Sequence, residues 1–81
     1  MGIIKGWIKH QTLKTREMWV HIHKKPFGET YVGFEKFANR RWRVFKKPAF
    51  GEIGDFTMGY RTSKEKARVV VLDYMKVNPH G

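Results

Sequence analysis

The chain has 81 residues, of which 41% are hydrophobic and 15% aromatic, so it can build one modest core and is not a disordered basic tail. It contains no cysteine, which excludes disulfides, thiolate metal sites and cysteine nucleophiles. Seventeen Lys and Arg against seven Asp and Glu give a net charge of +10, which favours polyanionic partners.

The first predicted element is a strand over residues 3–9, with Ile4 and Ile8 on one side and Trp7 on the other. Residues 11–15 are expected to form a loop. Lysines interrupt the apolar residues of the first segment and no small-residue cleavage site follows, so it does not resemble a secretory signal. No uncharged run is long enough to cross a bilayer. We therefore expect a cytoplasmic protein with no membrane partner.

Residues 19–34 and 42–60 form an internal repeat. Each copy contains β-favouring residues, the sequence Lys-Lys-Pro, a Phe-Gly pair and a second β-favouring segment. Because proline cannot donate to a ladder, it belongs in the connection, so each copy predicts a β-hairpin. The expected fold is α+β: a single domain over residues 1–81, in which a four- to five-stranded antiparallel meander packs against one C-terminal helix.

The helix is the last predicted element. The sequence Thr-Ser-Lys-Glu at residues 62–65 is typical of a capping box, and Asn78-Pro79 ends the helix near Lys76. Helical periodicity predicts a sheet-covering face made of Ala67, Val70, Val71, Tyr74 and Val77. Val69 and Leu72 fall among charged residues. Either the N-terminal strand or its loop covers them, or they form a docking patch for a second copy or a protein partner.

Strand alternation divides the predicted sheet into two faces, provided that no bulge reverses part of a strand. The face expected to form the core with the helix consists of Ile4, Ile8, Met18, Val20, Ile22, Val32, Phe34, Trp42, Val44, Phe56, Met58 and Tyr60. The face expected to be exposed consists of Lys5, Trp7, Lys9, Trp19, His21, His23, Tyr31, Arg41, Arg43, Phe45 and Arg61. This second face combines cations with aromatic rings and has no carboxylate.

A surface of this composition suits a nucleic acid, because Lys and Arg neutralise phosphates and exposed rings stack on bases. The Lys-Lys-Pro turns add cations that can reach phosphates. The predicted nucleic-acid-binding residues are Lys5, Trp7, Lys9, Trp19, Lys24, Lys25, Tyr31, Arg41, Arg43, Phe45, Lys46, Lys47 and Arg61. DNA is favoured over RNA as the ligand, while single and double strands, and a monomer and a homodimer, all stay open.

Residues 40–75 resemble the AP2/integrase arm-type DNA-binding domains, in which a three-stranded antiparallel sheet packs on one C-terminal helix. The matching segments are Arg41-Trp42-Arg43-Val44, Gly59-Tyr60 and residues 62–67. The resemblance implies that the sheet enters the major groove of DNA, with Arg41, Arg43 and Arg61 near the duplex. The loop over residues 48–55 and the hairpin before residue 40 depart from the family pattern.

Catalytic and metal sites are not predicted. His21 and His23 share a face at a spacing that can hold a metal, but no third ligand accompanies them. The carboxylates are scattered among cations, without a pair to divide acid and base roles, so neither enzyme activity nor a cofactor is expected. The alternative function is a small protein-interaction factor or inhibitor, a phage-type accessory protein that binds an acidic surface of a host nucleic-acid enzyme. In that case Val69 and Leu72 would contact the partner.

Overall fold

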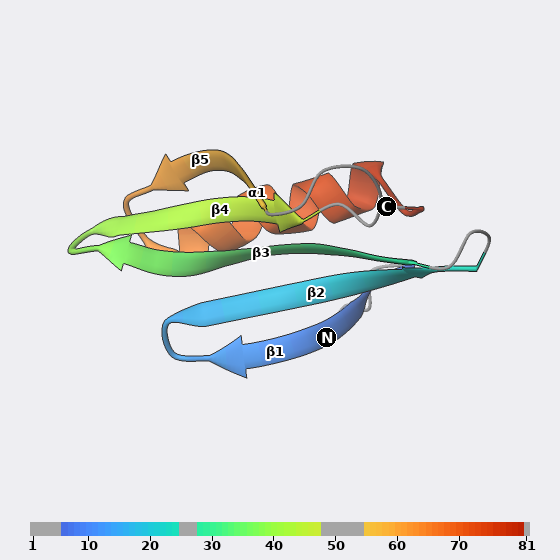
Figure 1. Cartoon of the computed structure of the whole chain (residues 1–81). Helices are drawn as coiled ribbons and strands as arrows, with labels where there is room; N and C mark the ends of the chain where they lie inside the picture. Colours follow the sequence, from blue (N-terminus) through green and yellow to red (C-terminus); the bar gives the residue numbers. More distant parts are fainter. Residues whose placement is uncertain (1–5, 25–27, 48–54, 81) are drawn as a thin grey trace.

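The computed structural model describes residues 6–24, 28–47 and 55–80. In chain order the elements are β1 (Ile8–Leu13), β2 (Arg16–His23), β3 (Gly28–Ala38), β4 (Arg41–Lys47), β5 (Phe56–Arg61) and α1 (Lys64–Val77). The strands form one antiparallel sheet in sequence order, and α1 packs across β3, β4 and β5 (Figure 1). The predicted α+β meander with a C-terminal helix is confirmed.

The first strand lies later in the chain than predicted. β1 runs from Ile8 to Leu13, so most of the expected loop is strand, and the turn to β2 contains only Lys14 and Thr15. These residues are mainly polar, and they are extended because pairing with β2 provides hydrogen-bond partners for their backbone N–H and C=O groups. A register shift between Lys9 and Gln11 marks an irregularity of the β-bulge kind in this hairpin.

The helix begins at a side-chain cap. The hydroxyl of Ser63, the N-cap residue, accepts a hydrogen bond from the backbone N–H of Lys66 at 3.2 Å. The fully buried helix residues, spaced four apart, are Ala67, Val71 and Met75. Val77, which was predicted on the same face, is 78% exposed at the last residue of the helix.

The strand register shows which side chains share a face, because directly paired residues project to the same side. Trp19 pairs with Val32, and Val32 pairs with Lys46, whose amine lies over the ring of Tyr74 in α1. These residues therefore face the helix. The core on this side consists of Trp7, Trp19, Val32, Phe34, Val44, Ala67, Val71 and Met75.

The predicted sides of the β1–β2 hairpin are therefore wrong. Trp7 and Trp19, expected on the exposed face, are 3% and 9% exposed, whereas Ile8 and Ile22, expected in the core, are 59% and 52% exposed. Burying two indole rings removes more apolar area from water than burying two isoleucines, so the hairpin turns its tryptophans toward the helix. In β5, too, the predicted core residues are exposed: Phe56, Met58 and Tyr60.

The opposite side of the sheet, the helix-free face, is also partly apolar. Met18 and Phe45 are buried there, and both pair with Gly33. A Cβ atom at Gly33 would stand 2.2 Å from the carbonyl oxygen of Glu17 in β2. Glycine is thus required for β2 to approach β3 this closely at Glu17 and Met18.

Candidate functional site

Exposed cations gather at one end of the sheet. The β1–β2 turn, the β3–β4 turn, the end of β5 and the start of α1 all lie at this end (Figure 1). The N–H of Lys36 donates to the carbonyl of Thr15 at 2.8 Å, and the amine of Lys64 donates to the carbonyl of Lys14 at 3.1 Å. These bonds hold the first turn against β3 and α1. We name this region the basic end; its exposed cations are Lys14, Lys36, Arg40, Arg41, Arg61 and Lys66.

Two exposed rings lie beside these cations. Phe37 is 55% and Tyr60 is 41% exposed, and their ring centroids are 5.2 Å apart. The guanidinium of Arg41 lies 5.4 Å from the centroid of the Tyr60 ring. Within the described residues, no carboxylate forms an ion pair with Arg40, Arg41 or Arg61. The basic end therefore offers uncompensated guanidinium groups next to accessible aromatic faces.

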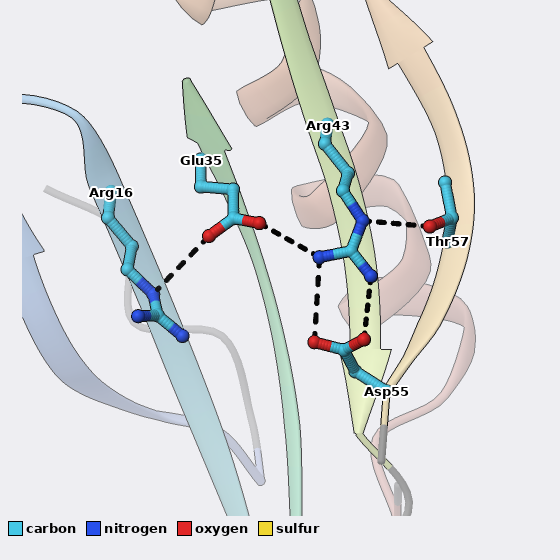
Figure 2. Close-up of polar contacts among 5 residues, drawn as sticks. All are labelled: Arg16, Glu35, Arg43, Asp55 and Thr57. Carbon is cyan, nitrogen blue, oxygen red and sulfur yellow. Dashed lines mark hydrogen bonds and ion pairs between the residues drawn. The ribbon is translucent and has the colours of Figure 1, made fainter. Parts of the chain in front are cut away.

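Arg43 is placed differently from its neighbour Arg41. Figure 2 shows its guanidinium bonded to Glu35 at 2.8 Å, to Asp55 at 2.6 Å and to the hydroxyl of Thr57 at 2.8 Å. The hydrogen bond to Asp55 raises the pKa of Arg43 and lowers that of Asp55. The side chain of Arg43 is only 14% exposed. The predicted absence of carboxylates from the Arg43 face is thus wrong, and Arg43 crosslinks β3, β4 and the residue before β5.

A hollow lies on the helix-free face beside this network. Phe45 is 1% exposed and sits under two guanidiniums, that of Arg16 at 5.5 Å and that of Arg43 at 5.4 Å from its ring centroid. The hollow next to it has a volume of about 360 Å³. Its lining residues are His10, Arg16, Met18, Tyr31, Phe45, Lys47 and Asp55.

Several other predicted binding residues point toward the helix. The amine of Lys9 pairs with the buried carboxylate of Glu17 at 3.1 Å and lies 4.3 Å from the centroid of the Trp19 ring. Lys46 covers Tyr74 in the same way. These two lysines, like the buried Trp7 and Trp19, do not join the arginines of the helix-free face, because their alternation places them on the other side of the sheet.

The remaining predicted residues are divided among three places. Tyr31 and Lys47 pair across β3 and β4 at the hollow. Lys24 is exposed in the turn after β2, at the opposite end of that strand from the basic end. Lys5 and Lys25 lie outside the described residues. The predicted docking patch is divided as well, because Val69 is 56% exposed whereas Leu72 packs against the core.

Sequence reasoning missed part of the basic end. Phe37 was not assigned to a face, and it lies at the register shift between Lys36 and Ala38, where simple alternation is interrupted. Arg40 was not singled out, although it forms the β3–β4 turn together with Asn39. The adjacent pair Arg40-Arg41 after an asparagine is a signal that could have predicted a cationic hairpin tip.

No metal centre is formed by the described residues, which contain no group of three or more histidine and carboxylate side chains close enough to hold an ion. His21 and His23 are ring neighbours, with centroids 4.7 Å apart. His21, however, contacts the carbonyl of Gly6, and His23 contacts the hydroxyl of Thr30. Among the described helices none has the length and apolar character to span a membrane.

No known protein family, curated protein or solved structure matches the chain. The residues and their geometry therefore carry the functional argument.

Proposed function

We propose that this protein binds nucleic acid, with DNA as the expected ligand, and that the basic end supplies the principal contacts. The observation that carries the proposal is the position of Arg41, whose uncompensated guanidinium lies over the exposed ring of Tyr60 and next to Arg40. Neutralisation of phosphates by such cations releases counterions, and the free faces of rings and guanidiniums accept bases.

The fold supports this use of the basic end, because four separate segments bring their cations together there. Both turns are two residues long, so the side chains on them are tied to the sheet rather than to long loops. The resemblance to AP2/integrase arm-type domains implies that Arg41 and Arg61 lie near DNA on one sheet face. The predicted side of Arg61 is wrong, because Arg61 pairs with Trp42 and so projects to the helix side of the sheet, opposite Arg41. Arg43, the third arginine in that comparison, has its charge compensated by Glu35 and Asp55, and we assign it a supporting role.

The first experiment measures the affinity of the protein for a duplex DNA, a single-stranded DNA and an RNA across a salt series. If about five phosphates are neutralised, log K falls against log[salt] with a slope of about −4 on duplex DNA. Arg41→Gln should lower the affinity and reduce the size of that slope by about 1. Lys76→Gln, which makes the same charge change at an exposed position of α1, is the matched control.

Arg40 provides a variant that separates the effect on binding from the effect on stability. Its φ of 58° is a left-handed conformation that costs an arginine about 1–2 kcal/mol but suits a glycine. We therefore expect Arg40→Gly to be no less stable than the parent and yet to bind DNA more weakly. Binding that does not depend on salt, or that is unchanged in both arginine variants, contradicts the proposal. A protein complex that persists after nuclease treatment would instead favour the protein-interaction alternative.

A further inference from the structure

The hollow on the helix-free face is a second feature with the chemistry of a binding site. Four strands contribute to its lining, from His10 in β1 to Lys47 in β4. Its volume of about 360 Å³ lies within the range of about 300–1,000 Å³ that is usual for small-ligand pockets. Tyr31 contributes a half-buried ring to the lining and packs edge-on against the ring of His10, with centroids 5.1 Å apart. Phe45 and Met18 form the buried floor, because Phe45 is 1% and Met18 is 9% exposed. The ring surface that the hollow offers to a flat, aromatic group is therefore that of Tyr31.

Two cations complete the hollow. The buried Nε of Arg16 lies 4.0 Å from a carboxylate oxygen of Glu35 and has no hydrogen-bond partner within the described part of the chain. Lys47 is exposed and has no ion pair there. The one carboxylate in the lining, Asp55, is already bonded to Arg43. The hollow thus combines the ring of Tyr31 with the charge of Lys47, which no carboxylate of the described residues pairs.

A ligand that matches both parts carries a planar ring and a phosphate, which is the composition of one nucleotide unit. The ring can stack on Tyr31 or on the guanidinium of Arg16, while the phosphate reaches Lys47. A base inside a duplex is paired and stacked and cannot enter such a hollow. The geometry therefore selects an unpaired base.

The hollow and the basic end lie along one strand. Arg41, Phe45 and Lys47 alternate onto the same face of β4, and the six-residue step from the first to the last covers about 20 Å at about 3.3 Å per residue. We propose that a single nucleic-acid strand runs along β4, with phosphates at the basic end and one unpaired base in the hollow. This inference rests on the proposed function and adds a preference for single strands.

The experiment compares binding of an oligothymidylate and of a blunt hairpin duplex to the whole protein. Lys47→Gln and Tyr31→Ala should weaken binding of the single strand at least fivefold, because a stacked base is lost or its phosphate is unpaired, and should leave duplex binding within twofold. Lys47→Gln alters only an exposed side chain, so it tests the proposal even if Tyr31→Ala is unstable. In parallel, thymidine monophosphate should shift the NMR signals of the Met18 methyl group and the Tyr31 ring.

The two proposals fail in different ways. If neither hollow variant affects the single strand selectively, while Arg41→Gln still weakens all nucleic acids, the hollow is not a base site and the proposed function stands. If thymidine monophosphate leaves the Met18 and Tyr31 signals unchanged at millimolar concentration, the base site is likewise excluded. If the parent protein binds no nucleic acid at low salt, the proposed function fails and the base site fails with it.

Discussion

Glu17 is the one buried carboxylate among the described residues, and three cations surround it. Its oxygens lie 3.1 Å from the amine of Lys9, 3.4 Å from that of Lys64 and 2.8 Å from the guanidinium of Arg68. Two of these partners belong to α1 and one to β1, so a single carboxylate in β2 ties the helix to the edge of the sheet. The charge of Lys9, which was predicted to bind nucleic acid, is thus compensated by Glu17.

Glu17 should make the stability of the protein sensitive to acid. Burial alone would raise its pKa, but hydrogen bonds from Arg68 and Lys9 outweigh burial and hold the pKa below the ordinary 4.5. Because the folded pKa is the lower one, its contribution is complete above about pH 4.5 and is lost as the pH falls through the folded pKa. Glu17→Gln should therefore lower the unfolding free energy by about 1–3 kcal/mol at neutral pH.

Urea denaturation at neutral pH and at about pH 3 measures this effect, with Asp73→Asn, an exposed helix position, as the control. The Glu17→Gln variant should show a smaller difference between the two conditions than the parent does. The difference that persists in the variant includes the contribution of Asp55, whose pKa is lowered mainly by its hydrogen bond to Arg43. An equal acid dependence in parent and variant would show that Glu17 is not the sensitive group.

At the level of elements, the close contact of β2 with β3 depends on Gly33. A methyl group there would collide with the backbone of β2, at the carbonyl of Glu17, and also with Met18. We expect Gly33→Ala to destabilise the protein by about 1–3 kcal/mol, the usual cost of overpacking. Thermal unfolding of this variant and of Lys36→Ala, at an exposed position of the same strand, makes the comparison. Equal midpoints would mean that β2 can move away at no cost.

Strands β2 to β5 could be predicted from local sequence, because runs of β-favouring residues recur there between segments that contain proline or glycine. The bounds were less predictable: β1 lies later than expected, and Lys46 and Lys47, expected in a turn, are the last residues of β4. The face that each strand turns to the helix could not be predicted from local sequence. Residues 18–23 alternate Met, Val and Ile with Trp, His and His, so either side offers apolar groups. The choice is made by tertiary packing, in which Trp19 joins Val32 against the helix. Alternation alone contains no information about that contact.

The candidate site was predicted in part for a related reason. Arg41 and Arg43 are the same residue type on the same predicted face, yet only Arg43 forms ion pairs with carboxylates of the described residues. The carboxylates that compensate Arg43 come from positions 8 and 12 residues away, and only the register of β3 and β4 and the approach of Asp55 bring them together. Arg41 lies near the turn, beyond the reach of those carboxylates, and its accessibility therefore follows from its place at the end of the strand.

At the level of the whole molecule, the two ends of the described chain meet. The indole N–H of Trp7 donates to the carbonyl of Asn78 at 2.8 Å, and its ring packs edge-on against Tyr74 at 6.2 Å. Gly6 adopts a φ of 85°, and a Cβ atom there would overlap the carbonyl of Pro79. Gly6 and Trp7 are thus held against the end of α1, and the sheet and helix are joined at both ends of the helix.

These contacts indicate a structural role for Trp7, whereas the sequence predicted a role in binding nucleic acid. Trp7→Phe keeps an aromatic ring in the core but leaves the Asn78 carbonyl without its donor, so the unfolding free energy should fall by about 1 kcal/mol. Affinity for nucleic acid, measured well below the unfolding temperature, should stay within twofold of the parent, because a 3% exposed ring has no free face for a base. A large, selective loss of single-strand affinity in a fully folded Trp7→Phe variant would mean that Trp7 leaves the core to contact the ligand. The parent sheet would then have to open at the β1 edge on binding, and protection of the β1–β2 amides from hydrogen exchange would fall when DNA is added.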